Sequence, residues 1–213
     1  MRKSLRRELF RGALKKAVIP SQPPLVRFCH WGFAVSISGL LVTGFELHQP
    51  APFLAVQYGQ LYVIHMVFCW FSLAFFALRV ADVIVRQDTS MLATLKDVKD
   101  FPRLLAYYFF LRATPPPAGK YNSGQKLVFT SWFIVFLLGS LLGFSSYYQG
   151  EHLTWVIRIT GGVQMLRWIK YAFAVYLSAT IALHIYLSLT QDLSRLQAML
   201  TGYERKGPKP KSP

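Results

Sequence analysis

Apolar residues gather in four long stretches of the chain, at about residues 25–47, 59–80, 127–147 and 167–189. An α-helix of about 20 apolar residues is long enough to cross the hydrocarbon core of a bilayer. We therefore predict an all-α fold, an integral membrane four-helix bundle that occupies residues 25–190. Residues 1–24 and 191–213 are predicted to be basic tails. The first stretch also contains Gly32, Gly39 and Gly44, small residues that allow a helix or a flat cofactor to approach closely.

The connection between the second and third stretches, residues 81–126, is long and polar. A connection of this length usually has a structure or function of its own. We predict an amphipathic cytoplasmic helix that starts near Met91, capped by residues 88–90. Pro102 should kink this helix, and the prolines at 115–117 should end it. Its apolar and basic positions alternate in a pattern suited to the membrane interface. They are Leu92, Leu95, Val98 and Leu105, with Lys96, Lys99 and Arg103.

Basic residues are concentrated on one side of the predicted bundle. The chain has 24 Lys and Arg and a formal net charge of +15. Residues 1–27 carry 8 of the 24, residues 79–126 carry 8 and the final tail carries 5, which leaves Arg158, Arg167 and Lys170 for the opposite side. The positive-inside rule then places both termini in the cytoplasm. Because these basic residues flank the spans, topology explains them, and we expect no nucleic-acid partner.

The amino-terminal segment, residues 1–27, has apolar residues interleaved with its basic ones. It could lie on an anionic inner leaflet. A disordered basic tail is an equally good interpretation. A cleaved signal peptide is less favoured, because the apolar stretch that follows has the length of a membrane span.

The rest of the composition narrows the chemistry. Hydrophobic residues make up 53% of the chain, which favours a compact membrane domain. The two cysteines, Cys29 and Cys69, form neither a C-x-x-C nor a C-x-x-C-H motif. This pattern excludes the usual zinc pairs and c-type haem attachment. No phosphate-binding loop or dinucleotide fingerprint is present.

Histidines inside apolar spans are the strongest candidates for function. His30 and His184 fall at matching depths near the cytoplasmic ends of the first and fourth spans, and His65 near the outer end of the second span matches Lys170 in the fourth. Lys170 and His184 also lie on one face of the fourth helix. Histidine is the usual axial ligand of haem iron, and b-type haem needs no cysteine. Two histidines at one depth favour ligation over simple packing.

Three short motifs accompany these histidines. They are Arg-Phe-Cys-His-Trp at residues 27–31, Tyr-Asn-Ser-Gly-Gln-Lys at 121–126 and Leu-His-Ile-Tyr at 183–186. Together with His65 they resemble the cytochrome b (gamma) subunit of membrane-bound formate dehydrogenases. That subunit belongs to a wider group of di-haem cytochromes that also serves nickel-iron hydrogenases and thiosulfate reductases. The resemblance runs from about residue 27 to residue 190.

The resemblance implies one or two b-type haems and a quinone in a bacterial inner membrane. It implies that His30 and His184 bind the cytoplasmic-side haem and that His65 binds the outer haem. Lys170 stands where the family has a histidine, which makes it the candidate for the second outer ligand. The alternatives are a lysine that extends to the lipid headgroups, or an outer haem that is five-coordinate or absent. The resemblance further implies that electrons pass between the iron-sulfur subunit of a catalytic partner and a quinone. The residues that would border the quinone site are Asn122, Gly124 and Gln125.

Other interpretations remain open. The histidines could only pack, in a haem-free membrane anchor for a partner enzyme. A small transporter is a further alternative, although the chain shows no inverted repeat. Asn122 and Gln125 fit a polar helix start as well as a quinone site. Glu46, His48 and His152 are predicted to lie outside, as part of a docking surface or as reserve haem ligands.

Overall fold

The computed structural model describes residues 17–49, 53–148, 153–190 and 193–206. Four helices in this part are long and apolar enough to cross a membrane. They are α2 (Pro24–His48), α3 (Tyr58–Arg86), α5 (Ser123–Tyr147) and α7 (Val163–Thr190). The predicted all-α membrane bundle is confirmed. Residues 1–16 of the basic amino-terminal segment 1–27 lie outside the described residues.

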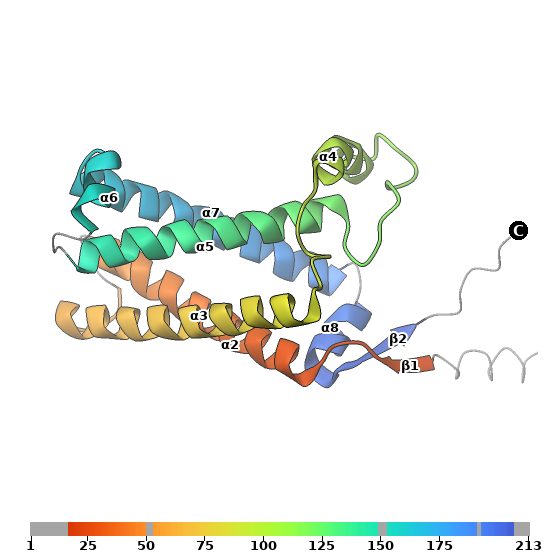
Figure 1. Ribbon diagram of the computed structural model, residues 1–213, viewed down its shortest axis with the longest axis horizontal. Coiled ribbons are helices and arrows are strands. Elements are labelled where there is room, and N and C mark those ends of the chain that lie inside the picture. Colours follow the sequence, from red (N-terminus) through yellow and green to blue (C-terminus); the bar gives the residue numbers. More distant parts are fainter. Residues whose placement is uncertain (1–16, 50–52, 149–152, 191–192, 207–213) are drawn as a thin grey trace, which may run out of the picture.

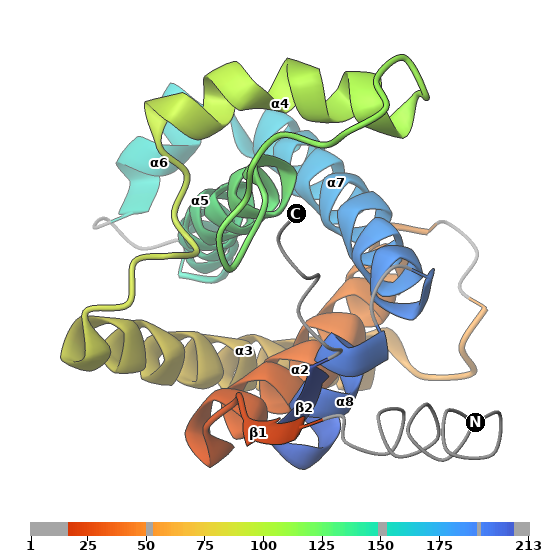
Figure 2. The same ribbon diagram turned by 90° about the vertical axis from the view of Figure 1, so that its right-hand side faces the viewer.

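Helices α2 and α3 run side by side along the length of the bundle (Figures 1 and 2). The glycines of α2 make this close contact possible. A Cβ atom built on Gly32 would come within 2.3 Å of the Phe75 ring, and one on Gly39 within 2.4 Å of the Phe68 ring. Gly32 and Gly39 therefore accommodate side chains of the neighbouring helix.

The third and fourth spans begin earlier than predicted. Helix α5 starts at Ser123 because Asn122 and Gln125 form a reciprocal capping box that satisfies its first backbone N–H groups. Before α7, Gly161 and Gly162 have φ values of 88° and 105°, which suit a turn made by glycine. The short helix α6 (Thr154–Ile159) precedes this turn. Buried Val156 of α6 packs with Leu142 and Leu166.

Both predicted tails contain secondary structure that the sequence analysis did not predict. Helix α8 (Leu193–Thr201) follows α7, and strand β2 (Tyr203–Lys206) follows α8. Strand β2 pairs antiparallel with β1 (Ala17–Pro20), so the two ends of the described chain meet. The Ser21 hydroxyl donates to a Glu204 carboxylate oxygen at 3.1 Å beside this sheet. We call this end of the bundle the terminal end (Figure 1).

The amphipathic helix of the long connection, α4, spans Leu95–Tyr108. Its predicted start at Met91 was wrong, because Thr94 and Asp97 form the capping box at the helix start. The predicted stop at residues 115–117 was also wrong, since α4 ends at Tyr108, and it continues through Pro102. Helix α4 runs across the direction of the spans at the terminal end, beside α5 (Figure 2).

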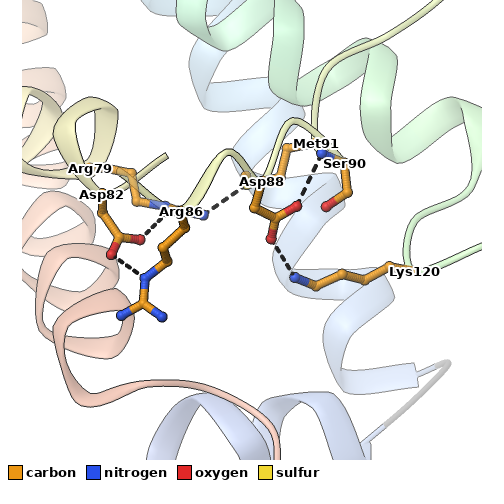
Figure 3. Close-up of polar contacts among 7 residues, drawn as sticks. All are labelled: Arg79, Asp82, Arg86, Asp88, Ser90, Met91 and Lys120. Atoms are coloured by element: carbon orange, nitrogen blue, oxygen red, sulfur yellow. Dashed lines mark hydrogen bonds and ion pairs between the residues drawn. The ribbon is translucent and has the colours of Figure 1, made fainter. Parts of the chain in front are cut away.

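Ion pairs at the end of α3 explain why this helix extends past residue 80 to Arg86. The buried Asp82 carboxylate accepts from Arg79 at 2.7 Å and from Arg86 at 2.6 Å (Figure 3). Farther along, Asp88 accepts from the Ser90 backbone N–H at 3.1 Å and from Lys120 at 3.1 Å. Hydrogen bonds from Ser90 and Lys120 lower the pKa of Asp88 to about 2. Asp88 thus ties together the two ends of the connection that contains α4.

Candidate functional site

The imidazole rings of His30 on α2 and His184 on α7 lie 6.5 Å apart between their centroids. Both side chains are half-buried within apolar helices. An imidazole nitrogen binds a metal such as zinc at about 2.0–2.1 Å, so two rings that share one metal ion have centroids roughly 6 Å apart. The spacing of His30 and His184 fits two axial ligands of one iron atom. The structure therefore brings together the pair that sequence analysis matched by depth.

Aromatic rings surround this histidine pair. The Trp31 ring lies 5.1 Å from that of His30, and the Phe129 and Trp132 rings lie 6.3 and 5.6 Å from that of His184. The Trp132 indole N–H is held by the hydroxyl of Thr180, at 2.8 Å. Such a shell limits access of water, and the flat apolar rings suit a flat macrocycle.

Two further observations test whether these residues fit a haem. The Nδ1 atom of His30 is buried without a hydrogen-bond partner among the described residues. A buried polar atom of this kind calls for an explanation, and a cofactor is one. Helix α7 has 28 residues, yet only Leu166 at its beginning is buried. A helix packed directly against three others would bury a stripe along its length, whereas the corresponding stripe of α7 is only half-buried, which suits a bound flat group.

A haem and a bare metal ion differ in the number of ligands that they need from the protein. Among the described residues, no group of three or more His, Cys, Asp or Glu side chains could hold a metal ion. A haem iron needs only axial ligands from the protein, because the porphyrin supplies the rest. The histidine pair is thus suited to haem rather than to a bare ion.

At the opposite end of the bundle, His65 and Lys170 are each hydrogen-bonded to a neighbouring helix. The Nδ1 atom of His65 lies 2.9 Å from the Thr43 hydroxyl on α2. A Cβ atom built on Gly44 would lie 3.3 Å from the His65 ring, so this glycine leaves room for the imidazole. The Lys170 amine donates to the Ser146 hydroxyl on α5 at 3.0 Å.

The other polar groups predicted near this end have structural partners. The His48 ring stacks on Tyr171 with centroids 4.5 Å apart. Glu46 is buried, and one of its carboxylate oxygens accepts from the Leu54 backbone N–H at 2.5 Å. These contacts tie the end of α2 to α7 and to the connection that follows α2. His152 lies outside the described residues.

The Tyr-Asn-Ser-Gly-Gln-Lys motif forms the start of α5 and also holds α4 in place. Asn122 Oδ1 accepts from the Gln125 backbone at 2.8 Å, and Gln125 Oε1 accepts from the Asn122 backbone at 3.1 Å. A Cβ atom on Gly124 would meet Leu104 of α4 at 3.0 Å. Lys126 pairs with Asp97 of α4 at 3.2 Å. Asn122 and Gln125 thus form the polar helix start that was one of the two predicted roles. Their side-chain N–H groups take no part in the capping bonds.

An aromatic path leads from this motif to the histidine pair. The Tyr121 ring lies 5.5 Å from the Phe129 ring, which in turn contacts the His184 ring. The motif and His184 are therefore separated by a single aromatic side chain. Arg195 of α8 also reaches Gln125 Oε1, at 3.5 Å.

Sequence reasoning missed the residues that hold α8 beside His30. Arg27 donates to the backbone carbonyls of Met199 and Leu200 at the end of α8. The Trp31 indole N–H donates to the same Met199 carbonyl at 3.0 Å. Both residues belong to the 27–31 motif that contains His30, and this motif was the one sequence signal that could have identified them. Their partners are backbone atoms, however, and backbone atoms leave no pattern in a sequence.

Comparison with known proteins agrees with this geometry. A family model described as prokaryotic cytochrome b561 matches residues 21–202. No curated protein matches the chain. The matched region includes the four long helices, the histidine pair, and the motif at residues 121–126.

Proposed function

The chain belongs to the prokaryotic cytochrome b561 family, and from this premise we propose that it carries electrons between the iron-sulfur subunit of a catalytic partner and a membrane quinone. Family membership and the four apolar helices make it a multi-pass membrane protein that binds haem b and transfers electrons. When bound, haem b supplies an iron atom that accepts and releases single electrons. The proposed partner is an oxidoreductase of the formate dehydrogenase type.

The observation that carries the proposal is the facing pair of His30 and His184. In it, one nitrogen ligand comes from α2 and the other from α7, with ring centroids 6.5 Å apart. The protein's own work is to hold both imidazoles at this spacing and to exclude water with the rings of Trp31 and Trp132. The apolar surroundings of the pair would influence the reduction potential of the bound iron.

The quinone is proposed to bind beside Asn122 and Gln125. A quinone carbonyl accepts hydrogen bonds, so it needs N–H or O–H donors. The capping box engages the amide oxygens of these two residues, whereas their amide N–H groups are donors. The ring contacts from Tyr121 through Phe129 to His184 support a quinone position near the histidine pair.

His65 and Lys170 are the proposed ligands of a second, outer haem. His65 comes from α3 and Lys170 from α7, and their hydrogen bonds to Thr43 and Ser146 hold both at the end of the bundle away from the histidine pair. The hydroxyls of Thr43 and Ser146, which are hydrogen-bonded to His65 and Lys170, would then orient the two ligands. The asymmetry of basic residues supports an orientation in which the terminal end faces the cytoplasm of a bacterial cell.

The test is a reduced-minus-oxidised absorption spectrum of the purified full-length protein, together with its haem content. His30→Ala and His184→Ala should each remove the same haem, while the protein still inserts into the membrane. His48→Ala is the matched control, because this histidine stacks on Tyr171 at the opposite end of the bundle and is not proposed to bind the haem between His30 and His184. Full haem content and an unchanged spectrum in both ligand variants would contradict the proposal. A haem-free wild-type protein would favour a membrane anchor.

A further inference from the structure

Helix α4 is held in one rotation against α5. Leu104 is buried and packs against Gly124, and Asp97 pairs with Lys126 at 3.2 Å. These two contacts lie on the same side of α4 because positions seven apart coincide on a helix. The other sides of α4 therefore face away from the bundle.

The remaining circumference divides into an apolar and a basic face. The apolar face consists of four exposed residues at spacings of three, seven and four, namely Leu95, Val98, Leu105 and Phe109. The basic residues Lys96, Lys99 and Arg103 lie about 100° farther round the helix. One side of α4 thus faces the bundle, a second side is apolar and a third is basic. A helix at a membrane surface has this arrangement, with its apolar side toward the lipid and its basic side toward the headgroups and water.

The apolar face continues into a turn of large exposed side chains. Phe109, Phe110 and Leu111 are 69%, 95% and 78% exposed. Phe110 has a φ of 59°, an uncommon conformation for a bulky residue. Backbone hydrogen bonds fix the turn, from Phe110 N–H to the Tyr107 carbonyl at 3.0 Å and from Leu111 N–H to the Ala106 carbonyl at 2.8 Å. The backbone therefore presents these side chains outward.

Two hollows meet at Arg112, just after this turn. The first, of about 300 Å³, is lined by Arg103, Arg112, Thr114, Asp100 and the prolines at 115–117. The second, of about 500 Å³, is lined mainly by Tyr107, Tyr108, Phe110 and Leu111. Arg112 lines both hollows. A polar, basic hollow thus adjoins an aromatic and aliphatic one.

We propose that this end of α4 binds an anionic phospholipid of the surrounding leaflet. The phosphate would lie between the guanidinium groups of Arg103 and Arg112, which match its geometry and charge. The acyl chains would cover the hollow beside Phe110 and Leu111. Arg103 is paired with Asp100 at 3.4 Å, a weak exposed pair that a phosphate can replace. Within the described part of the chain, no ion pair engages Arg112.

Continuity with the apolar face of α4 favours a membrane lipid over a soluble phosphate compound or a protein. The exposed stripe from Leu95 to Phe109 leads directly to the hollow that would take the acyl chains. A soluble ligand would use the basic hollow and leave this stripe in water, at a cost in hydrophobic free energy. The inference does not depend on haem or quinone binding.

The experiment is native mass spectrometry of the full-length protein extracted from nanodiscs that contain equal amounts of phosphatidylglycerol and phosphatidylcholine. Wild-type protein should retain phosphatidylglycerol preferentially. Arg112→Ser and Arg103→Ser should each lower this retention roughly tenfold, since each removes a charge-assisted contact. Phe110→Ser should lower the retention of long-chain phosphatidylglycerol more than that of its dihexanoyl analogue. Arg158→Ser, an equal charge change on exposed α6, is the matched control and should have no effect.

Circular dichroism and gel filtration of each variant check that it is folded. Equal retention of the two lipids by wild-type protein would overturn the proposal, as would unchanged retention in both arginine variants. Displacement of the lipid by millimolar inorganic phosphate would indicate a soluble ligand and would likewise overturn it. So would protection of Phe109–Leu111 from proteolysis by a bound protein but not by lipid.

Discussion

Lys170 donates its hydrogen bond to Ser146 of the neighbouring helix α5, at 3.0 Å. A lysine at the end of a membrane span commonly extends toward the headgroups. Here the half-buried amine instead contacts a hydroxyl on another span. The Lys170 amine therefore points toward a neighbouring helix, where it could bind a cofactor held between the helices.

Lys170 variants test the proposed outer haem. Lys170→His should keep a haem of ordinary bis-histidine type, whereas Lys170→Met should change the spectrum or potential of one haem and spare the other. An amine binds iron only when neutral, so ligation by Lys170 should weaken as the pH falls. Potentiometric titration followed by absorption at several pH values measures both effects. An unchanged spectrum and potential in Lys170→Met would show that Lys170 is no ligand.

Conservative variants separate the capping and quinone roles of the 121–126 motif. Asn122→Asp and Gln125→Glu keep the oxygen atoms that cap α5 and remove the amide N–H donors. Each should slow oxidation of the reduced haem by quinone about tenfold, the effect of one lost hydrogen bond. Stopped-flow absorption measures the rate, and haem content should not change. Unaltered rates in both variants would place the quinone elsewhere.

The contacts of Arg27 and Trp31 with α8 should matter for the haem that His30 is proposed to bind. Arg27→Leu removes the guanidinium bonds to the end of α8, at a cost of about 1–3 kcal/mol. Trp31→Phe removes only the indole N–H and keeps a ring beside His30. Both should alter the potential or the electron paramagnetic resonance signal of the His30 haem, with the larger change in Arg27→Leu. Signals identical to wild type would mean that α8 does not position His30.

Asp88 should stabilise the connection around α4 in a pH-dependent way. Its pKa is lowered to about 2 in the folded protein, compared with about 3.9 in an unfolded chain. A lowered carboxylate pKa gives a stabilisation that is complete above the unfolded value and is lost as the pH falls through the folded value. At pH 7, Asp88→Asn should increase hydrogen exchange in residues 88–120. This difference from wild type should shrink between about pH 4 and pH 2; a difference independent of pH would contradict the assignment.

The spans and the histidine pair could be predicted because each leaves its own pattern. A long apolar run is enough to mark a span, and the positions of His30 and His184 within two such runs give their depth. The start of α4 was wrong because the chain offers two capping candidates, at residues 88–90 and at Thr94. Asp97, three residues after Thr94, decides between them through a reciprocal bond. Gly32 and Gly39 could equally have faced a cofactor, and only packing shows that they face Phe75 and Phe68.

The ends of the chain were predicted least well. Strands β1 and β2 are 4 residues each, too short for an alternating pattern to stand out among basic residues. Their partner lies at the far end of the sequence, and no local rule identifies a pairing of this kind. The hydroxyl of Thr43 escaped notice for a similar reason, because a single threonine in an apolar span has many possible partners.

The antiparallel pairing of β1 with β2 also sets an order of assembly. Ser21 and Glu204, which are hydrogen-bonded beside this sheet, are 183 positions apart in the chain. During synthesis the first span enters the membrane long before residues 193–206 leave the ribosome. The sheet and the α8 contacts therefore form only after all four spans have been synthesised. Until then Arg27 and Trp31, on either side of His30 in the sequence, lack the backbone partners that α8 supplies.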